Sequence, residues 1–243
     1  MKGFRDEIQK AGAVIVGALK DTYGYLGTVL LVSILWFAAA AAVVFLMSLF
    51  IESLLVALPV VIVLTSPLIG AGFYVTNLIL QGDYVAPLDM LEGLRRFFWR
   101  SLAVSGVQVA LASILVLDIV WFLARPTWLS KIVGIVFIYA LLFVAMVSTY
   151  LFPVTINQDV GFTQTLKNAA LLTLANPFYS LAVALFQIGV AVLSLRFVPP
   201  VFCMAYLGFV GFLGNRATVV LLRHYGVIPD TEGGGQNGSE ASD

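Results

Sequence analysis

Side chains able to do acid–base, nucleophilic or metal chemistry are scarce in this 243-residue sequence. The sequence has one histidine, His224, and one cysteine, Cys203, so it offers no catalytic dyad and no run of metal ligands. The acids that could act within a membrane, Glu52, Asp118 and Asp159, fall at the ends of apolar segments with no partner acid or base nearby in the sequence. No glycine-rich phosphate loop leads into a helix. These observations predict that the protein is not an enzyme and has no catalytic residue, metal site or cofactor.

The composition indicates where such a chain resides. Hydrophobic residues make up 61% of it, charged residues 11%, and the mean hydropathy is +1.02. A soluble domain has roughly 45–50% apolar and about 25% charged residues. The composition therefore predicts an integral membrane protein, with the lipid bilayer as its first partner. Because 13 basic residues balance 13 acidic ones, no net field favours binding to nucleic acid.

Six apolar stretches are long enough to cross a bilayer, which takes about 20 residues each as a helix. They predict an all-α fold, a polytopic transmembrane helical bundle. The predicted transmembrane domain covers residues 28–222, with spans at about 28–50, 54–79, 102–124, 132–152, 178–195 and 199–220.

The placement of lysine and arginine predicts the orientation of the chain. If the N-terminus is cytoplasmic, all but three of the 13 basic residues lie on the cytoplasmic side, as the positive-inside rule requires. The three exceptions are Arg125, Lys131 and Arg196. This distribution predicts a multi-pass protein of the cell membrane with both termini in the cytoplasm.

The two ends of the chain differ in character. Residues 1–27 mix bases with Asp6, Glu7 and Asp21, which predicts a retained, partly amphipathic segment rather than a signal peptide. Residues 229–243 contain acids, no bases and almost nothing apolar, which predicts a disordered acidic tail.

The second predicted span contains helix-breaking and small residues, namely Pro59, Pro67, Gly70 and Gly72. Proline removes a backbone donor, and the carbonyls it frees must be satisfied away from lipid. We expect residues 60–70 to face the bundle interior or a cavity, with the hydroxyls of Thr65 and Ser66 bonding freed carbonyls. Two interpretations remain open: a kink with small residues that allow close packing, or a discontinuous helix that lines a substrate or ion path.

Two stretches between spans predict short helices along the inner membrane surface. Residues 87–100 place charged side chains on one helical stripe and leucines with Phe98 on another. Residues 162–175 occupy the corresponding place later in the chain, and Asn176-Pro177 ends them. Both helices could also present a surface to a partner.

The same stretches suggest an internal duplication of span, short helix and span. The first half of the chain contains, in this order, Tyr74, Gln81 and Ser101. The second half contains the same residue types in the same order, at Tyr150, Gln158 and Ser180. This alignment places Asp118 next to Arg196, and Gln108 at a depth comparable to that of Gln187. We therefore predict that Asp118 pairs with Arg196, or else with Arg125 or Lys131, either to lock helices or to serve a gating or ligand role.

Three motifs resemble a known family. They are Leu58-Pro59-Val60-Val61 with Ser66-Pro67 and Phe73-Tyr74-Val75, then residues 91–101 (LEGLRRFFWRS), and then Tyr150-Leu151-Phe152-Pro153 with Leu166-Lys167-Asn168-Ala169. In content and order they resemble the YesL-like bacterial integral membrane proteins, although Ser66 stands where that family usually has glycine. The resemblance implies a membrane protein of unsettled biochemical role, often associated with carbohydrate uptake.

Two functions follow from these observations. The first is a non-enzymatic accessory or scaffold component, in which the chain packs against a membrane protein partner or a second copy of itself. The second is a small-solute transporter or channel, in which the 59–72 region lines the path and Gln108 and Gln187 supply polar contacts.

Overall fold

The computed structural model describes residues 2–49, 53–86, 88–158 and 160–227, which form eight α-helices and no strand. The helices are α1 (Lys2–Gly24), α2 (Leu26–Ser48), α3 (Leu54–Gln81), α4 (Asp89–Leu123), α5 (Trp128–Gln158), α6 (Phe162–Ala175), α7 (Pro177–Phe197) and α8 (Pro199–His224). Six of them, α2, α3, α4, α5, α7 and α8, are long and apolar enough to cross a membrane. The prediction of an all-α protein with six spans is therefore confirmed. The predicted acidic tail, 229–243, lies outside the described residues.

Two helix boundaries are set by proline. Asn176 (φ −136°, ψ 67°) and Val198 (φ −140°, ψ 65°) each precede a proline that opens the next helix. A residue before proline is pushed out of the α region, and proline itself suits the first helical position, where its missing N–H costs nothing. The predicted helix 162–175 is confirmed as α6, since Asn176-Pro177 separates it from α7.

The corresponding boundary in the first half of the chain does not form. The predicted short helix 87–100 and the predicted span 102–124 are one continuous helix, α4, of 35 residues. The sequence across the expected boundary, FWRSLAV, contains neither proline nor glycine, so nothing stops the helix there. At 1.5 Å per residue α4 is about 52 Å long, well beyond the ~30 Å hydrocarbon core, so its first turns lie outside that core.

Helix α1 is the amphipathic segment predicted for residues 1–27. It buries Ala11, Val14 and Ala18, which recur at intervals of three and four, against α7 and α8. Tyr25 (φ −116°, ψ 36°) separates α1 from the first span, α2. The apolar stripe therefore docks α1 on the bundle.

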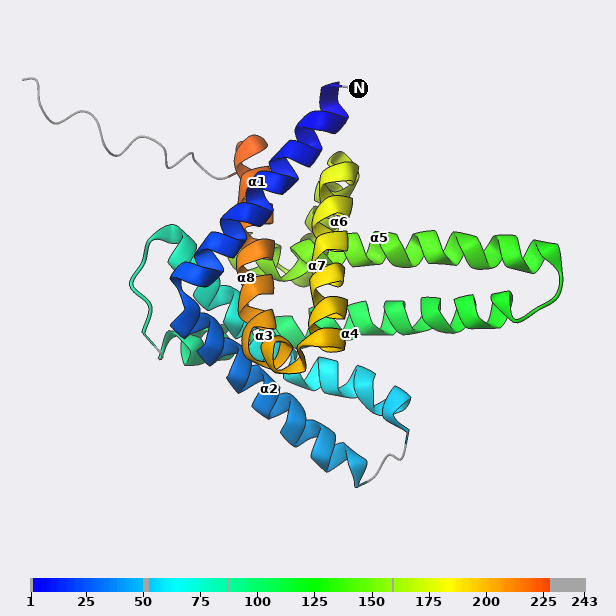
Figure 1. The fold of residues 1–243 in the computed structure, drawn as a ribbon, viewed down its shortest axis with the longest axis horizontal. Helices are drawn as coiled ribbons and strands as arrows, with labels where there is room; N and C mark the ends of the chain where they lie inside the picture. Colours follow the sequence, from blue (N-terminus) through cyan, green and yellow to red (C-terminus); the bar gives the residue numbers. More distant parts are fainter. Residues whose placement is uncertain (1, 50–52, 87, 159, 228–243) are drawn as a thin grey trace, which may run out of the picture.

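The six spans are arranged as three helical hairpins, α2–α3, α4–α5 and α7–α8. In Figure 1 the α4–α5 hairpin and the α2–α3 hairpin extend in different directions from a common base through which α8 runs. Helix α8 packs so closely on α2 that a methyl group on Gly208 would lie 2.8 Å from the Cα of Val29. Small residues of this kind allow helices to approach each other in a membrane.

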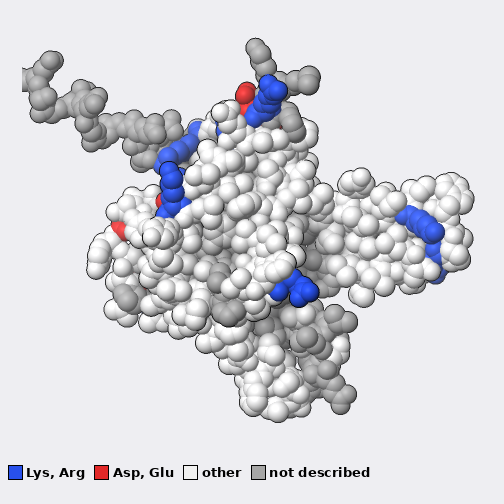
Figure 2. Space-filling view, in the orientation of Figure 1, with Lys and Arg blue, Asp and Glu red and all other residues white. Residues whose placement is uncertain are grey.

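Most of the surface in view is uncharged. Figure 2 shows lysine and arginine side chains along the α1 side of the molecule, at the tip of the α4–α5 hairpin and at one site in the lower centre. The first turns of α1 and the last turns of α8 lie at the same end of the molecule (Figure 1). Both ends of the described chain therefore point to one face.

Candidate functional site

The proline-containing region of the second span is a continuous helix. Helix α3 runs from Leu54 to Gln81 with Pro59 and Pro67 inside it. Proline at position 67 removes the N–H that would bond the carbonyl of Val63, and the Ser66 hydroxyl donates to that same carbonyl at 2.7 Å. The expectation that hydroxyls satisfy freed carbonyls is confirmed for Ser66. Thr65 instead bonds the carbonyl of Val61, which no proline deprives of its backbone donor. The interpretation of α3 as a discontinuous helix is wrong.

The small residues after Pro67 serve packing. A methyl group on Gly70 would collide with the Oγ of Ser101 on α4, and one on Gly72 would lie 2.7 Å from Val32 on α2. Ser66 is fully buried, as is expected of a residue that faces the bundle interior. The 59–72 region is therefore a site of close helix packing, which was the first of the two interpretations.

The two glutamines predicted to lie at comparable depth do converge on one space. Gln108 of α4 and Gln187 of α7 line a cavity of about 440 Å³ that is walled by all six spans, here called the central cavity. Four other polar side chains line it: Trp36, Ser148, Thr149 and Tyr206. Twelve apolar residues complete the wall, including Phe73 and Phe152, whose rings stack with centroids 5.4 Å apart. The cavity is thus mostly apolar, with uncharged polar groups at a few points.

The polar groups of the central cavity differ in how they are satisfied. The hydroxyl of Thr149 lies 3.5 Å from the Oε1 of Gln187, and the Tyr206 hydroxyl also interacts with the Gln187 side chain. The Ser148 hydroxyl donates to the carbonyl of Val144 in its own helix at 2.7 Å. Within the described residues the Gln108 side chain has no hydrogen-bond partner, so its amide is open to the cavity.

The predicted ion pair of Asp118 is wrong. In the part of the chain that the structure describes, no ion pair joins Asp118 to Arg196, Arg125 or Lys131. Asp118 lies on the α4–α5 hairpin and Arg196 on the separate α7–α8 hairpin, where it is exposed. The guanidinium of Arg125 instead stacks 3.7 Å above the ring of Trp121.

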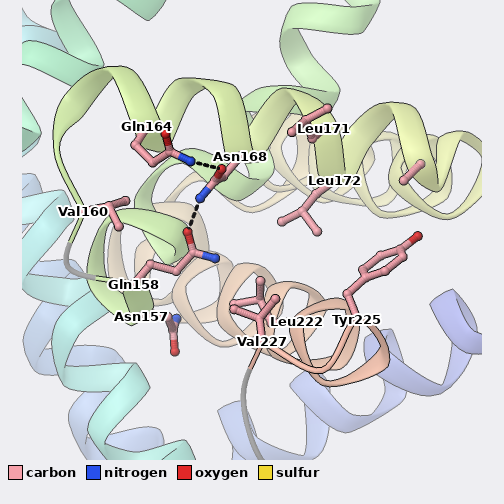
Figure 3. A pocket seen from close by; sticks show the side chains of 11 residues that line it. Asn157, Gln158, Val160, Gln164, Asn168, Leu171, Leu172, Leu222, Tyr225 and Val227 are labelled. Carbon is pink, nitrogen blue, oxygen red and sulfur yellow. Dashed lines mark hydrogen bonds between the residues drawn. The ribbon is translucent and has the colours of Figure 1, made fainter.

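A second hollow lies where α5 ends, α6 runs and α8 ends. It has a volume of about 730 Å³, and we call it the amide groove. Its side-chain amides lie where α5 ends and in the first half of α6, and apolar residues follow in the second half of α6 and at the end of α8. The lining includes Asn157, Gln158, Gln164, Asn168, Leu171, Leu172, Leu222 and Tyr225. Figure 3 shows Gln158 and Asn168 beside the same gap that Leu172, Leu222 and Tyr225 border.

Three of the four amides form a hydrogen-bonded row, while Asn157 donates to the carbonyl of Pro153 in its own helix. Gln164 donates from Nε2 to the Oδ1 of Asn168 at 2.8 Å, and Asn168 donates from Nδ2 to the Oε1 of Gln158 at 2.5 Å (Figure 3). Across the described chain, neither the Nε2 of Gln158 nor the Oε1 of Gln164 enters a further hydrogen bond. The row therefore presents a donor at one end and an acceptor at the other.

The sequence predicts α6 as a short helix along the inner membrane surface that could also present a surface to a partner, but it does not predict the groove beside it. The signal was present, because four amides within twelve residues are unusual in so apolar a chain. The sequence does not reveal that the end of α8, some fifty residues later, forms the opposite side of the groove. Glu52 and Asp159, considered above as intramembrane acids, lie outside the described residues.

The described polar side chains that line the two hollows are mainly amides and hydroxyls rather than typical metal ligands. Among the described residues no group of three or more His, Cys, Asp or Glu side chains could hold a metal ion. Cys203 is free and half-buried, and His224 packs edge-on against Tyr225 at the end of α8. Both hollows are suited to binding by hydrogen bonds and apolar contact.

Comparison of the chain with protein-family models, with curated proteins and with solved structures finds no match. The resemblance to the YesL-like family therefore stays a prediction. What the fold does establish is a helical protein whose six apolar spans suit a membrane.

Proposed function

We propose that this protein is a non-enzymatic accessory component of a membrane complex, and that it holds a segment of another membrane protein in the amide groove. The observation that carries the proposal is the pairing, in one groove, of an amide row with an apolar wall. An extended peptide segment offers the matching surface, since its backbone needs donors and acceptors while its alternate side chains need apolar contacts.

The composition of the groove favours a peptide over a charged ligand. Among the residues that the structure describes, its lining contains neither an acid nor a base, so these residues provide no counter-charge for a phosphate or a carboxylate. Leu171 is about half exposed in the absence of a partner, which leaves apolar area to bury on binding.

The proposed position is also suited to contact with a membrane partner. The amide groove lies on the end of the molecule where α1 begins and α8 ends, the end predicted to face the cytoplasm (Figure 1). A segment held there would belong to a partner spanning the same membrane, of the kind that the accessory role requires. The predicted link to solute uptake, which rests on the family resemblance, would make a transporter that partner.

The test is co-purification of the intact complex from native membranes in mild detergent. Leu171→Arg places a charge in the groove, and we expect the amount of co-purifying partner to fall about tenfold, because one buried leucine is worth about 1.5–3 kcal/mol. Leu166→Arg is the matched control, since Leu166 is exposed on the same helix about 140° around its axis from Leu171.

Two results would contradict the proposal. One is equal loss of partner with both substitutions. The other is flux of a sugar or other small solute into vesicles that contain the purified protein alone, which would favour the transporter function instead.

A further inference from the structure

The central cavity lies at the depth of the bilayer centre. Gln187 is ten residues from Pro177 and ten from Phe197, the two ends of α7. At 1.5 Å per residue this places it about 15 Å from either end of a span whose length matches the ~30 Å hydrocarbon core. Any occupant of the cavity is therefore surrounded by hydrocarbon as well as protein.

The cavity presents hydrogen-bonding groups that carry no charge. Its polar lining consists of two amides, two aliphatic hydroxyls, a phenol and an indole. An ion at this depth would need an opposite charge or a wet path, and the described residues of the lining supply no charged side chain. The chemistry of the wall therefore selects an uncharged occupant.

The side-chain amide of Gln108 is the polar group of the central cavity that is available to bond an occupant. The Gln108 side chain is half-buried, and an amide left unbonded in hydrocarbon is costly. The described residues give Gln108 no hydrogen bond, whereas Gln187, across the same cavity, meets the hydroxyls of Thr149 and Tyr206. An occupant with a carbonyl or hydroxyl group would satisfy the free amide.

The rim of the cavity indicates the route of entry. Ile62 of α3 and Ile188 of α7 line the cavity and are also exposed, at 43% and 44%. They belong to different hairpins, and exposed apolar side chains at this depth face lipid. The occupant therefore arrives from the membrane, with an apolar body suited to the stacked rings of Phe73 and Phe152.

We propose that the central cavity binds an uncharged lipid-soluble molecule through its carbonyl or hydroxyl group, with Gln108 and Gln187 as the hydrogen-bonding residues. The volume of about 440 Å³ falls within the usual range of small-molecule pockets, roughly 300–1,000 Å³. It holds a head group and the adjoining part of an apolar body, while a longer tail can extend through the rim into lipid. This binding site is separate from the amide groove and does not depend on the accessory role.

The test uses three photoactivatable diazirine probes with the same hydrocarbon chain. One is a primary alcohol, one an alkane and one a quaternary ammonium. The purified full chain is placed in phosphatidylcholine vesicles, each probe is activated by light, and labelled peptides are mapped by mass spectrometry. We expect the alcohol to label the 141–152 region of α5 about five-fold more than the alkane or the ammonium does, as one added hydrogen bond would produce.

Two variants test whether labelling by the alcohol probe depends on the central cavity. Gln108→Leu with Gln187→Leu removes the hydrogen-bonding groups and should reduce labelling by the alcohol to the level of the alkane. Ala112→Phe fills part of the cavity and should reduce labelling by both probes, which gives a second measurement if the double variant folds poorly. Gln9→Leu makes the same chemical change on the exposed face of α1 and should leave labelling unchanged.

The proposal is overturned if the alcohol and the alkane label the cavity equally, since the space would then be a crevice for ordinary acyl chains. It is also overturned if the ammonium probe labels as strongly as the alcohol, or if no probe labels the 141–152 region above the other lipid-facing helices.

Discussion

A single hydroxyl compensates for a proline in the middle of a span. Pro67 leaves the carbonyl of Val63 without its usual N–H donor, and Ser66 supplies the missing bond from its side chain at 2.7 Å. The helix thereby keeps its continuity without exposing a bare carbonyl to hydrocarbon.

This compensation predicts a coupling between two neighbouring residues. Ser66→Ala should lower the free energy of unfolding by about 1–3 kcal/mol, because it leaves a buried carbonyl unpaired. In a Pro67→Ala background the backbone N–H returns, and the same serine change should cost well under 1 kcal/mol. The measurement is reversible unfolding in mixed micelles for all four proteins of the cycle.

Ser148→Ala is the matched control for that cycle. The Ser148 hydroxyl also bonds a carbonyl of its own helix, that of Val144, but there the backbone N–H of residue 148 is available to the same carbonyl. Its removal should change stability little. Equal costs for Ser66→Ala with and without Pro67 would show that the hydroxyl does not replace the missing donor.

Helix α1 is fastened to the bundle by two acids as well as by its apolar stripe. Asp21 receives two hydrogen bonds from the guanidinium of Arg216 on α8, which lies across Gly17. Near the other end of α1, the Oε2 of Glu7 accepts the backbone N–H groups of Phe178 and Tyr179, at 3.1 and 3.0 Å. These N–H groups belong to the first turn of α7, where a negative charge is favoured.

The Asp21–Arg216 pair predicts a rescue by charge exchange. Asp21→Arg or Arg216→Asp alone should speed hydrogen exchange in α1 about tenfold, which corresponds to a loss of about 1.4 kcal/mol for a partly exposed pair. The double exchange should restore most of the protection, because the pair is reformed in the opposite sense. Exchange is measured by mass spectrometry on peptides of α1.

Asp6→Arg, on the exposed face of the same helix, serves as the control for charge alone and should leave exchange unchanged. Failure of the double variant to recover protection would mean that the geometry of this pair, rather than its charges, is what α1 requires.

Element boundaries were predictable where a residue sets them. Pro177 stops one helix and opens the next, and the predicted helix 162–175 has the bounds of α6. The expected end at residue 100 rested on a change from charged to apolar residues, which does not end a helix, and α4 continues through it. The ion pair of Asp118 failed for a related reason, since the duplication aligns positions along the chain but says nothing of the angle between two hairpins.

The molecule as a whole is suited to lipid contact rather than to an aqueous surface. Large apolar side chains such as Leu117, Ile135 and Val192 are more than 45% exposed on three different spans. In a bilayer such side chains face hydrocarbon, whereas in water they would promote aggregation. The exposed apolar area therefore agrees with the six spans.

The predicted orientation of the chain in the membrane determines which side chains a water-soluble reagent can reach from outside the cell. In a Cys203→Ser background, Lys131→Cys at the start of α5 should react with an impermeant maleimide in intact cells, whereas Lys10→Cys in α1 should react only after the cells are permeabilised. Both positions are exposed, so a difference between them reports the side of the membrane. The reverse pattern, or equal labelling of both in intact cells, would refute the predicted orientation.

Hydropathy identified each span because the bilayer acts on every span separately. It could not identify the central cavity or the amide groove, since each is closed by helices that are distant in the sequence. The sequence places Gln108 and Gln187 at comparable depth in the membrane, but their convergence on one cavity depends on how α4 and α7 pack. Binding surfaces in this protein are properties of the hairpin arrangement, and the arrangement is carried by contacts such as Gly208 on Val29 that periodicity does not reveal.

The contact of Glu7 with the first turn of α7 joins residues that are 171 and 172 positions apart. A ribosome completes α1 before it completes α7 and α8, so α1 must wait for its binding surface to be made. Until then its apolar stripe and its two acids have only solvent, lipid or a chaperone to meet. Docking of α1 is thus a late step of biogenesis, and a chain arrested before α7 would display this helix undocked to cellular quality control.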